Sequence, residues 1–356
     1  MPNSADFSET EQEAELSALV KLVQQRYRTT IAVASAFYHE REKAVFRLDR
    51  EAGHSWVARI FPRSFGPERI EGDAAVLGLM ARAGIPAERV VPAADGSRVA
   101  SMDGRGVLVT RFVPGSPPKL TPAVLRSLGE IVGRMHALPA VAGAGGYLSR
   151  RAAALPRDDL DFGLARLASV VGRVPDPLVA QYEELQAALL AADGCEQLPF
   201  SLVHLDCQPG NVLRTPGGRL VLFDWDGAGQ GPAVAALGVL LYGCAFGSLA
   251  GRPAPPDITR VDAVLAGYSA RHWLSAAELD HLGHAIRFRP LAVAARELAA
   301  TIERGETILR PGWWSGWQQS DEIAARARQA AEARAAQQTE ASGSLLTTDQ
   351  GRGMPG

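Results

Sequence analysis

Two polar motifs on either side of a predicted hairpin constrain this sequence more than any other feature. The first occupies residues 204–211 and reads H-x-D-x-x-x-x-N, and the second is Phe-Asp-Trp-Asp at 223–226. Short apolar runs flank a Thr-Pro-Gly-Gly turn at 215–218, which predicts two strands that bring Asn211 and Asp224 to the same end. A lone H-x-D is more often a capped polar loop. The ordered set instead predicts the hydroxyl-orienting and Mg²⁺-binding groups of kinase-type phosphoryl transfer.

These motifs resemble those of the aminoglycoside phosphotransferase and choline-kinase-like family, small-molecule kinases with a protein-kinase-like fold. The resemblance covers about residues 30–300, and the matching positions are His204, Asp206, Gly210 and Asn211 in H-x-D-x-x-x-G-N, and Asp224 and Asp226 in D-x-D. It implies that Asp206 accepts or orients the proton of the acceptor hydroxyl. It also implies that Asn211 and Asp224 hold Mg²⁺, with Asp226 in support.

The same resemblance implies the reactants and two supporting residues. ATP or GTP is the expected co-substrate, and a hydroxyl of a small molecule is the expected acceptor. His204 is expected to brace the catalytic loop, and Gln208 stands where protein kinases place a lysine near the transferring phosphate. The acceptor itself is left open among antibiotics, amino alcohols, sugars and other metabolites.

A basic residue for the phosphates is expected on the third strand. Trp-Val-Ala-Arg at 56–59 stands in the place of V-A-I-K in protein kinases, so the resemblance implies that Arg59 grips phosphate oxygens. The alternative is a strand arginine with its head group in water. The resemblance also favours Asp73 over Glu71 as the carboxylate partner of Arg59, because Asp73 lies four residues before Leu77 and so matches the E-x-x-x-L spacing typical of the family.

Two further nucleotide contacts follow from order along the chain. The resemblance implies that main-chain groups near Arg111 and Val113 hold adenine at the hinge between the lobes, although an ordinary strand would have the same sequence. The loop that covers the phosphates is expected at residues 34–40, which contain no glycine. Kinases use glycines there so that the backbone can approach the phosphates.

The predicted fold class is α+β, in two lobes. Residues 1–29 are expected to form a polar leader and a helix, and 30–113 a small lobe with an antiparallel sheet of about five strands and one helix. Residues 114–335 are expected to form a larger, mainly helical lobe that carries the catalytic loop, the metal site and the acceptor pocket. The Gln-, Thr-, Ser- and Gly-rich segment 336–356 is expected to be a disordered tail.

Composition narrows the class of protein. The 356 residues carry a net charge of −2, which argues against nucleic acid as the main partner. Three cysteines and a polar, acidic N-terminus indicate a cytoplasmic protein, with neither a disulfide framework nor a signal peptide. The uncharged stretch 233–250 is long enough for a membrane span, but its glycines and its lack of basic flanks favour a buried helix. A monomer or weak dimer is expected.

One rival interpretation stays open from the sequence alone. A non-catalytic, nucleotide-binding regulator on the same scaffold would account for the glycine-free loop, for Arg59 and for Gln208. It accounts less well for the joint presence of Asp206, Asn211 and Asp224, because a degenerate kinase is expected to lose at least one of them. The Asp-Phe-Gly at 161–163 precedes the catalytic loop, so it is not expected to bind the metal.

Overall fold

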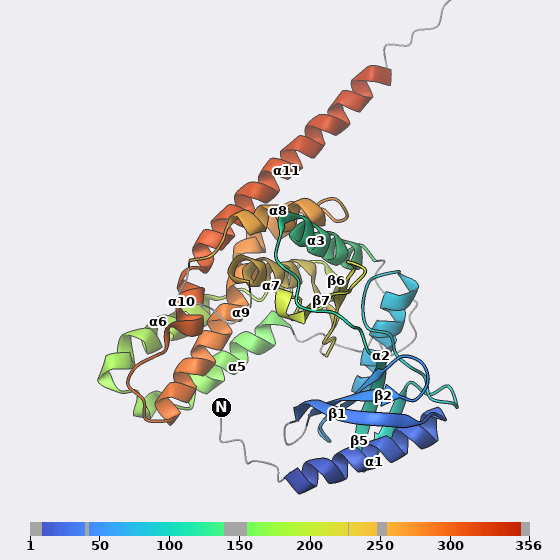
Figure 1. Ribbon diagram of the computed structural model, residues 1–356. Coiled ribbons are helices and arrows are strands. Elements are labelled where there is room, and N and C mark those ends of the chain that lie inside the picture. Colours follow the sequence, from blue (N-terminus) through green and yellow to red (C-terminus); the bar gives the residue numbers. More distant parts are fainter. Residues whose placement is uncertain (1–8, 40–42, 139–154, 227, 248–254, 350–356) are drawn as a thin grey trace, which may run out of the picture. The chain divides into compact units, whose positions relative to one another are not determined.

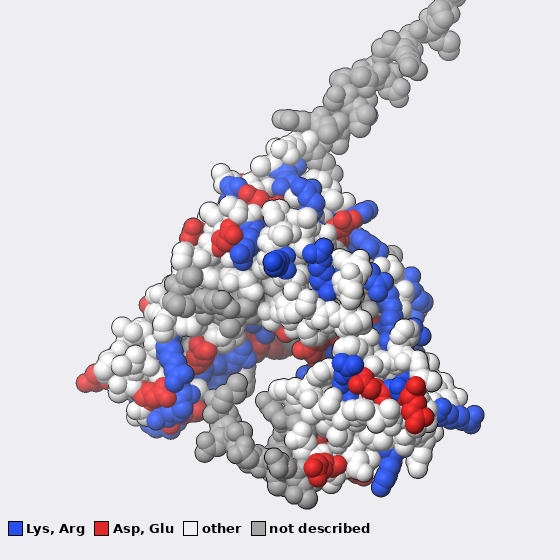
Figure 2. Space-filling view, in the orientation of Figure 1, with Lys and Arg blue, Asp and Glu red and all other residues white. Residues whose placement is uncertain are grey.

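The computed structural model describes residues 9–39, 43–138, 155–226, 228–247 and 255–349. These form two compact units, and each is considered by itself. The first comprises residues 9–118 and 211–230, and the second comprises 119–138, 155–210 and 231–349. Both acidic and basic side chains occupy the face shown in Figure 2.

The first unit is built on an antiparallel sheet of five strands in the order β1-β2-β3-β5-β4. Alternation of buried and half-buried residues along β2 puts Phe46 and Leu48 into the core, as expected of a strand with one covered face. Helix α1 (Glu9–Tyr27) adds Leu19 and Val23 to the same core (Figure 1). The strands are β1 (Ile31–His39), β2 (Ala44–Arg50), β3 (Trp56–Ile60), β4 (Val99–Met102) and β5 (Arg105–Arg111).

Helix α2 (Pro67–Arg82) also packs on this sheet, against β4 and β5. It begins with Pro67 at its first turn, a position that proline tolerates well. Ile70 on its buried face lies so near Gly106 that a Cβ there would come within 2.1 Å of the Ile70 Cδ1 atom. The glycine therefore permits the close contact between helix and sheet.

The hairpin predicted between the two motifs belongs to the first unit. It consists of β7 (Val212–Arg214) and β8 (Leu220–Leu222), with Val212 paired to Leu222. The Phe223 amide donates to the Asn211 carbonyl at 3.1 Å, so the two motif ends are adjacent. The sequence assigned residues 211–230 to the larger lobe, whereas in the structure they join the first unit. Hydrogen bonds from Leu222 to Pro86, and between Arg214 and Ser116, account for that difference.

The second unit is mainly helical. Its elements are α3 (Pro122–His136), α5 (Pro156–Ala168), α6 (Val179–Ala191), α7 (Ala233–Phe246), α8 (Thr259–Tyr268), α9 (Ala276–Glu303), α10 (Pro311–Gln318) and α11 (Ser320–Asp349), with the 3-10 turns Val171–Arg173 and Asp176–Leu178. Strand β6 (Phe200–Val203) leads into the catalytic loop, which ends in the 3-10 turn Pro209–Asn211, and β9 (Gly229–Pro232) precedes α7. Ser275 and Glu278 form a capping box at the start of α9.

Helix α7 is the predicted buried helix. Every residue from Ala233 to Ala245 is buried, and Gly238 lets α7 approach the main chain of Ala285 in α9. Residues 248–250 of the uncharged stretch lie outside the described part. Among the described residues, no helix is both long and apolar enough to cross a membrane.

Two boundary predictions differ from the structure. Strand β1 extends to His39, so residues 34–39 of the expected phosphate loop are strand, and residues 40–42 lie outside the described part. Helix α11 continues to Asp349, through much of the segment 336–356 that was expected to be disordered. Extending an existing helix needs no new nucleus, so the Ala-rich start of α11 propagates into a segment of weak propensity. Residues 350–356 lie outside the described part.

Candidate active site

Arg59 forms a buried, two-point ion pair with Glu88. Its Nη1 atom donates to Glu88 Oε2 at 2.6 Å, and its Nη2 atom to Oε1 at 2.5 Å. The two residues are only 7% and 4% exposed. Burial alone would lower the pKa of the Arg59 guanidinium, but the facing Glu88 carboxylate outweighs it and raises that pKa. Arg59 is therefore a fixed positive charge, not a strand arginine with its head group in water.

The carboxylate partner differs from the sequence prediction. Asp73 was expected to pair with Arg59 from the helix, whereas the ion pair is made by Glu88, which follows α2 in the chain. Asp73 lies on α2 and is 1% exposed. A glutamate has the longer side chain and meets the planar guanidinium with both oxygens, the stronger geometry for an arginine.

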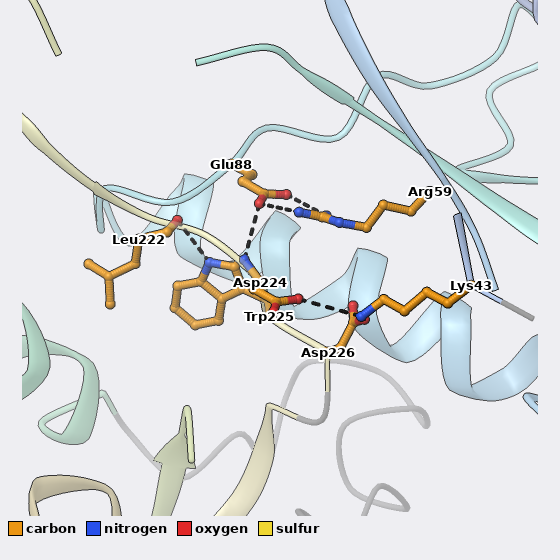
Figure 3. Close-up of polar contacts among 7 residues, drawn as sticks. All are labelled: Lys43, Arg59, Glu88, Leu222, Asp224, Trp225 and Asp226. Atoms are coloured by element: carbon orange, nitrogen blue, oxygen red, sulfur yellow. Dashed lines mark hydrogen bonds and ion pairs between the residues drawn. The ribbon is translucent and has the colours of Figure 1, made fainter. Parts of the chain in front are cut away.

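Glu88 also connects Arg59 to the second motif. The Asp224 amide donates to Glu88 Oε1 at 3.2 Å (Figure 3). Asp224 has φ +62°, in the left-handed region that is costly for most residues but tolerated by aspartate. The next residue, Trp225, is buried and donates from its indole Nε1 to the Leu222 carbonyl at 3.1 Å. The turn that holds Asp224 is thus anchored on both sides.

Lys43 is a site residue that the sequence analysis missed. Its ammonium lies 2.7 Å from Asp226 Oδ2 and 3.9 Å from Asp224 Oδ1, as Figure 3 shows. Burial lowers the pKa of Lys43, but Asp226 more than compensates, so the net shift is upward. Lys43 immediately precedes β2. A basic residue at the start of a strand has no sequence pattern from which its contact with a motif about 180 residues later could be predicted.

The predicted metal ligands have the chemistry that Mg²⁺ requires. Asn211 and Asp224 lie at the two ends of one hairpin, and Asp226 follows two residues later. They offer one amide and two carboxylate oxygens, and a cation already sits between the two carboxylates in the form of the Lys43 ammonium. Within the described residues, no cluster of three or more His, Cys, Asp or Glu could hold a metal ion. Mg²⁺ fits such a site when substrate phosphates complete its coordination.

A cavity of about 680 Å³ opens beside these charges, with every lining residue in the first unit. Its charged lining residues are Lys43, Arg47, Arg59, Glu88, Arg111 and Asp224. The other lining residues are largely apolar, namely Phe37, Tyr38, Val45, Val57, Thr110, Phe112, Val113, Gly115, Leu213, Val221 and Phe223. A cavity that combines charged and apolar lining residues matches a molecule that joins a flat base to phosphates.

The predicted hinge residues lie on the wall of this cavity. The Arg111 amide already donates to the Arg89 carbonyl at 2.8 Å, and the Phe112 amide to the Ser55 carbonyl at 2.9 Å. A contact from Arg111 to a base would therefore have to use its carbonyl. Val113 lines the same wall two residues later.

Residues 204–210 of the predicted catalytic loop lie in the second unit, where His204 is fully buried. The Asp206 amide donates to His204 Nδ1 at 3.3 Å, and the Cys207 amide to the His204 carbonyl at 2.9 Å. These are the contacts of a residue that shapes the loop. Asp206 and Gln208 are both partly exposed.

A second arginine, also missed by the sequence analysis, holds this loop from α9. Arg289 donates from Nη2 to the Leu205 carbonyl at 3.0 Å, and its Nη1 lies 2.8 Å from Asp159 Oδ2 on α5. Arg296, two turns further along α9, lies 4.0 Å from the other Asp159 oxygen. Opposite charges therefore gather next to the residue that precedes Asp206.

Comparison with known proteins agrees with this geometry. The sequence matches the phosphotransferase enzyme family over residues 34–279, which is more than half of the chain. The chain belongs to this family. Phosphoryl transfer to a small-molecule hydroxyl is therefore the activity of this chain, and neither its family nor its relatives favour a non-catalytic regulator.

Named relatives and solved structures refine the likeness. The homoserine kinase of Acidiphilium cryptum is 30% identical over 244 residues, 65% of this chain and 72% of that protein. The homoserine kinase of Caulobacter vibrioides is 27% identical over 257 residues, 69% and 77% of the two chains.

Two solved structures show the likeness in fold. The amicoumacin kinase hAmiN, in complex with AMP-PNP, Ca²⁺ and Ami, has a TM-score of 0.61 at 18% identity and covers 92% of this chain and 96% of its own. The choline kinase LicA of Streptococcus pneumoniae has a TM-score of 0.55 at 13% identity, over 89% and 99% of the two chains. At these identities the structures show the kinase-like fold of the phosphotransferase and nothing finer.

Proposed function

We propose that this phosphotransferase moves the γ-phosphoryl group of Mg²⁺-bound ATP to the side-chain hydroxyl of a small amino acid of the homoserine type. The observation that carries the nucleotide half is the continuous contact from Arg59 through Glu88 to Asp224 along one wall of the cavity. Through Glu88, this contact connects Arg59, the proposed positive charge for the phosphates, to Asp224, a proposed metal ligand.

The residues then divide the work. Arg59 would hold phosphate oxygens, and the apolar part of the cavity, with main-chain groups of Arg111 and Val113, would hold the base. Asn211, Asp224 and Asp226 would hold Mg²⁺, which when bound neutralises charge on the phosphate oxygens. Asp206 would orient the attacking hydroxyl and accept its proton, on a loop shaped by His204.

The homoserine type of acceptor rests on two supports. The first is the set of homoserine kinases at 27–30% identity, each matched over more than 70% of its own length. The second is the charge cluster beside the catalytic loop, where Asp159 lies between Arg289 and Arg296. An amino acid carries both an ammonium and a carboxylate, so it needs counter-charges of both signs near one another.

Transfer of label from γ-labelled ATP tests the proposal directly. Homoserine should be labelled in preference to choline, threonine and an aminoglycoside, and ATP should be preferred to GTP as donor. Asp206→Asn should retain the fold and reduce turnover by on the order of 10²–10⁴, the usual contribution of a positioned general base. Labelling of choline or the aminoglycoside without labelling of homoserine would show that the acceptor is not an amino acid of the homoserine type. Full turnover in a folded Asp206→Asn protein would remove Asp206 from the mechanism.

Metal dependence is tested separately from the acceptor. ATP with Mg²⁺ at ~100 times its Kd should add about 2.7 kcal/mol to the free energy of unfolding. Asp224→Ala should lose most of the part of this gain that depends on Mg²⁺. An equal gain from ATP with and without Mg²⁺ in the wild-type protein would contradict the metal assignment.

A further inference from the structure

Lys43 occupies a position that a second cation would also seek. Its ammonium contacts Asp226 Oδ2 at 2.7 Å and lies 3.9 Å from Asp224 Oδ1. The Asp226 side chain is 16% exposed, and the Lys43 side chain, at 35%, retains access to solvent. A monovalent ammonium is thus held between the two carboxylates of the D-x-D motif, on a flexible side chain.

Two other cations of the cavity, Arg59 and Arg47, have partners outside the D-x-D motif. Arg59 is held at two points by Glu88. Arg47, on β2, pairs with Asp49 and stacks over the Phe112 ring, with 4.4 Å from its guanidinium carbon to the ring centroid. Lys43 lines the same cavity and forms ion pairs with both D-x-D carboxylates.

We propose that Lys43 is a stand-in cation: in the nucleotide-free protein it neutralises Asp224 and Asp226, and Mg²⁺-nucleotide displaces its ammonium onto the phosphate oxygens. The idea rests on the nucleotide half of the proposed function and makes no use of the acceptor. An ammonium and a divalent ion cannot both occupy the Asp226 carboxylate without strong repulsion. The phosphates that arrive with Mg²⁺ supply new negative charge, and Lys43 lines the same cavity.

Two consequences distinguish a stand-in cation from an ordinary surface lysine. Metal alone must compete with Lys43, so it binds the free protein weakly. Metal together with nucleotide gives Lys43 a new partner, so that competition disappears. Metal and nucleotide therefore favour each other's binding, and Lys43 carries part of that coupling.

The first measurement is Mn²⁺ binding to the full-length, nucleotide-free protein, followed by electron paramagnetic resonance. Lys43→Met should tighten Mn²⁺ binding about three- to tenfold, the equivalent of a partly exposed ion pair and the repulsion that it removes. Lys43→Arg keeps the charge and should stay near the wild-type value. Arg47→Met is the matched control, because it removes a positive charge from the same cavity that does not contact the D-x-D carboxylates. It should change Mn²⁺ binding less than twofold.

The second measurement is the affinity for Mn²⁺-ATP, from the shift in melting temperature or from calorimetry. Lys43→Met should weaken this affinity about three- to tenfold, opposite in sign to its effect on Mn²⁺ alone. In an Asp226→Asn background, Lys43→Met should change Mn²⁺ binding less than it does in the wild type, because its closer contact is already weakened and only that with Asp224 remains.

Each outcome decides the proposal without any phosphoryl transfer. If Lys43→Met and Arg47→Met tighten Mn²⁺ binding equally, any positive charge in the cavity has the same effect as Lys43. That result would overturn the proposal. Unchanged or weaker Mn²⁺ binding in a folded Lys43→Met protein would also overturn it. If no acceptor is ever labelled but the two affinities move in opposite directions, the proposed function fails and the role of Lys43 stands.

Discussion

The buried ion pair between Arg59 and Glu88 predicts a large loss of stability when one of the two charges is removed. Glu88→Gln keeps the shape of the side chain but removes its charge, and so leaves the Arg59 guanidinium buried without a counter-ion. Removing one partner of a buried ion pair costs roughly 3–5 kcal/mol. Because Arg59 and Glu88 are 7% and 4% exposed and bonded at two points, about 3 kcal/mol is a conservative expectation for the loss of unfolding free energy.

A double-mutant cycle isolates the pair from its surroundings. Arg59→Met should itself be destabilising, because it leaves the Glu88 carboxylate buried. Combining Arg59→Met with Glu88→Gln removes both charges, so the double mutant should be less destabilised than the sum by about 2 kcal/mol or more. The same cycle between Arg59→Met and Asp73→Asn should be additive within about 0.5 kcal/mol.

Urea unfolding followed by circular dichroism gives the free energies of unfolding. The affinity of the same variants for ATP tests the proposed role of Arg59 in binding phosphate. The double mutant should regain stability but not affinity for ATP, because the charge that grips phosphate is gone. A coupling energy near zero between Arg59 and Glu88, with a large one between Arg59 and Asp73, would refute the assignment of Glu88. Full ATP affinity in the double mutant would refute the phosphate role of Arg59.

Two further predictions concern the second unit. Burial, and then His272, lower the pKa of His136 to about 3, so between pH 6.5 and 3 a proton binds the unfolded chain but not the folded one. Stability should fall as the pH drops through that range, by about 2 kcal/mol from this residue at pH 5, and urea unfolding at pH 7.5 and 5 should show the loss in the wild type but not in His136→Gln. Arg289→Met removes the hydrogen bond to the Leu205 carbonyl and should lower kcat at saturating acceptor about tenfold or more, with ATP affinity unchanged. Its neighbour Arg287→Met is the control, and an equal loss of kcat in both proteins would contradict a positioning role for Arg289.

Much of the fold follows from local patterns in the sequence. Turn residues at 215–218 and the short apolar runs around them specify the hairpin, because a tight turn places the two strands that it joins side by side and antiparallel. The periodicity of α2 and the capping box at Ser275 and Glu278 are equally local, and both appear in the structure. The ends of elements were less well predicted, as the extension of β1 to His39 and of α11 to Asp349 shows.

The partners in the candidate site were harder to predict. Arg59 was recognised as a candidate, but Glu88 lies 29 residues away and carries no periodic signal that marks it. Lys43 and Asp226, or Arg289 and Leu205, meet only after distant segments have packed. The spacing that favoured Asp73 does not predict which carboxylate can contact a guanidinium with both of its oxygens. That contact is determined by tertiary packing.

The two cations on the nucleotide side explain how the site can work without a glycine-rich loop and with arginine in place of lysine. Arg59 is buried, always charged and fixed at two points, so it is suited to hold phosphates in one place and unsuited to follow them. Lys43 has one close contact, a flexible stem and access to solvent, so it is suited to move. A lysine in place of Arg59 would lose the second hydrogen bond to Glu88, and an arginine in place of Lys43 would keep its charge on the D-x-D carboxylates. Each departure from the protein-kinase pattern is therefore consistent with a division of labour in which one cation positions the phosphates and the other exchanges with the metal.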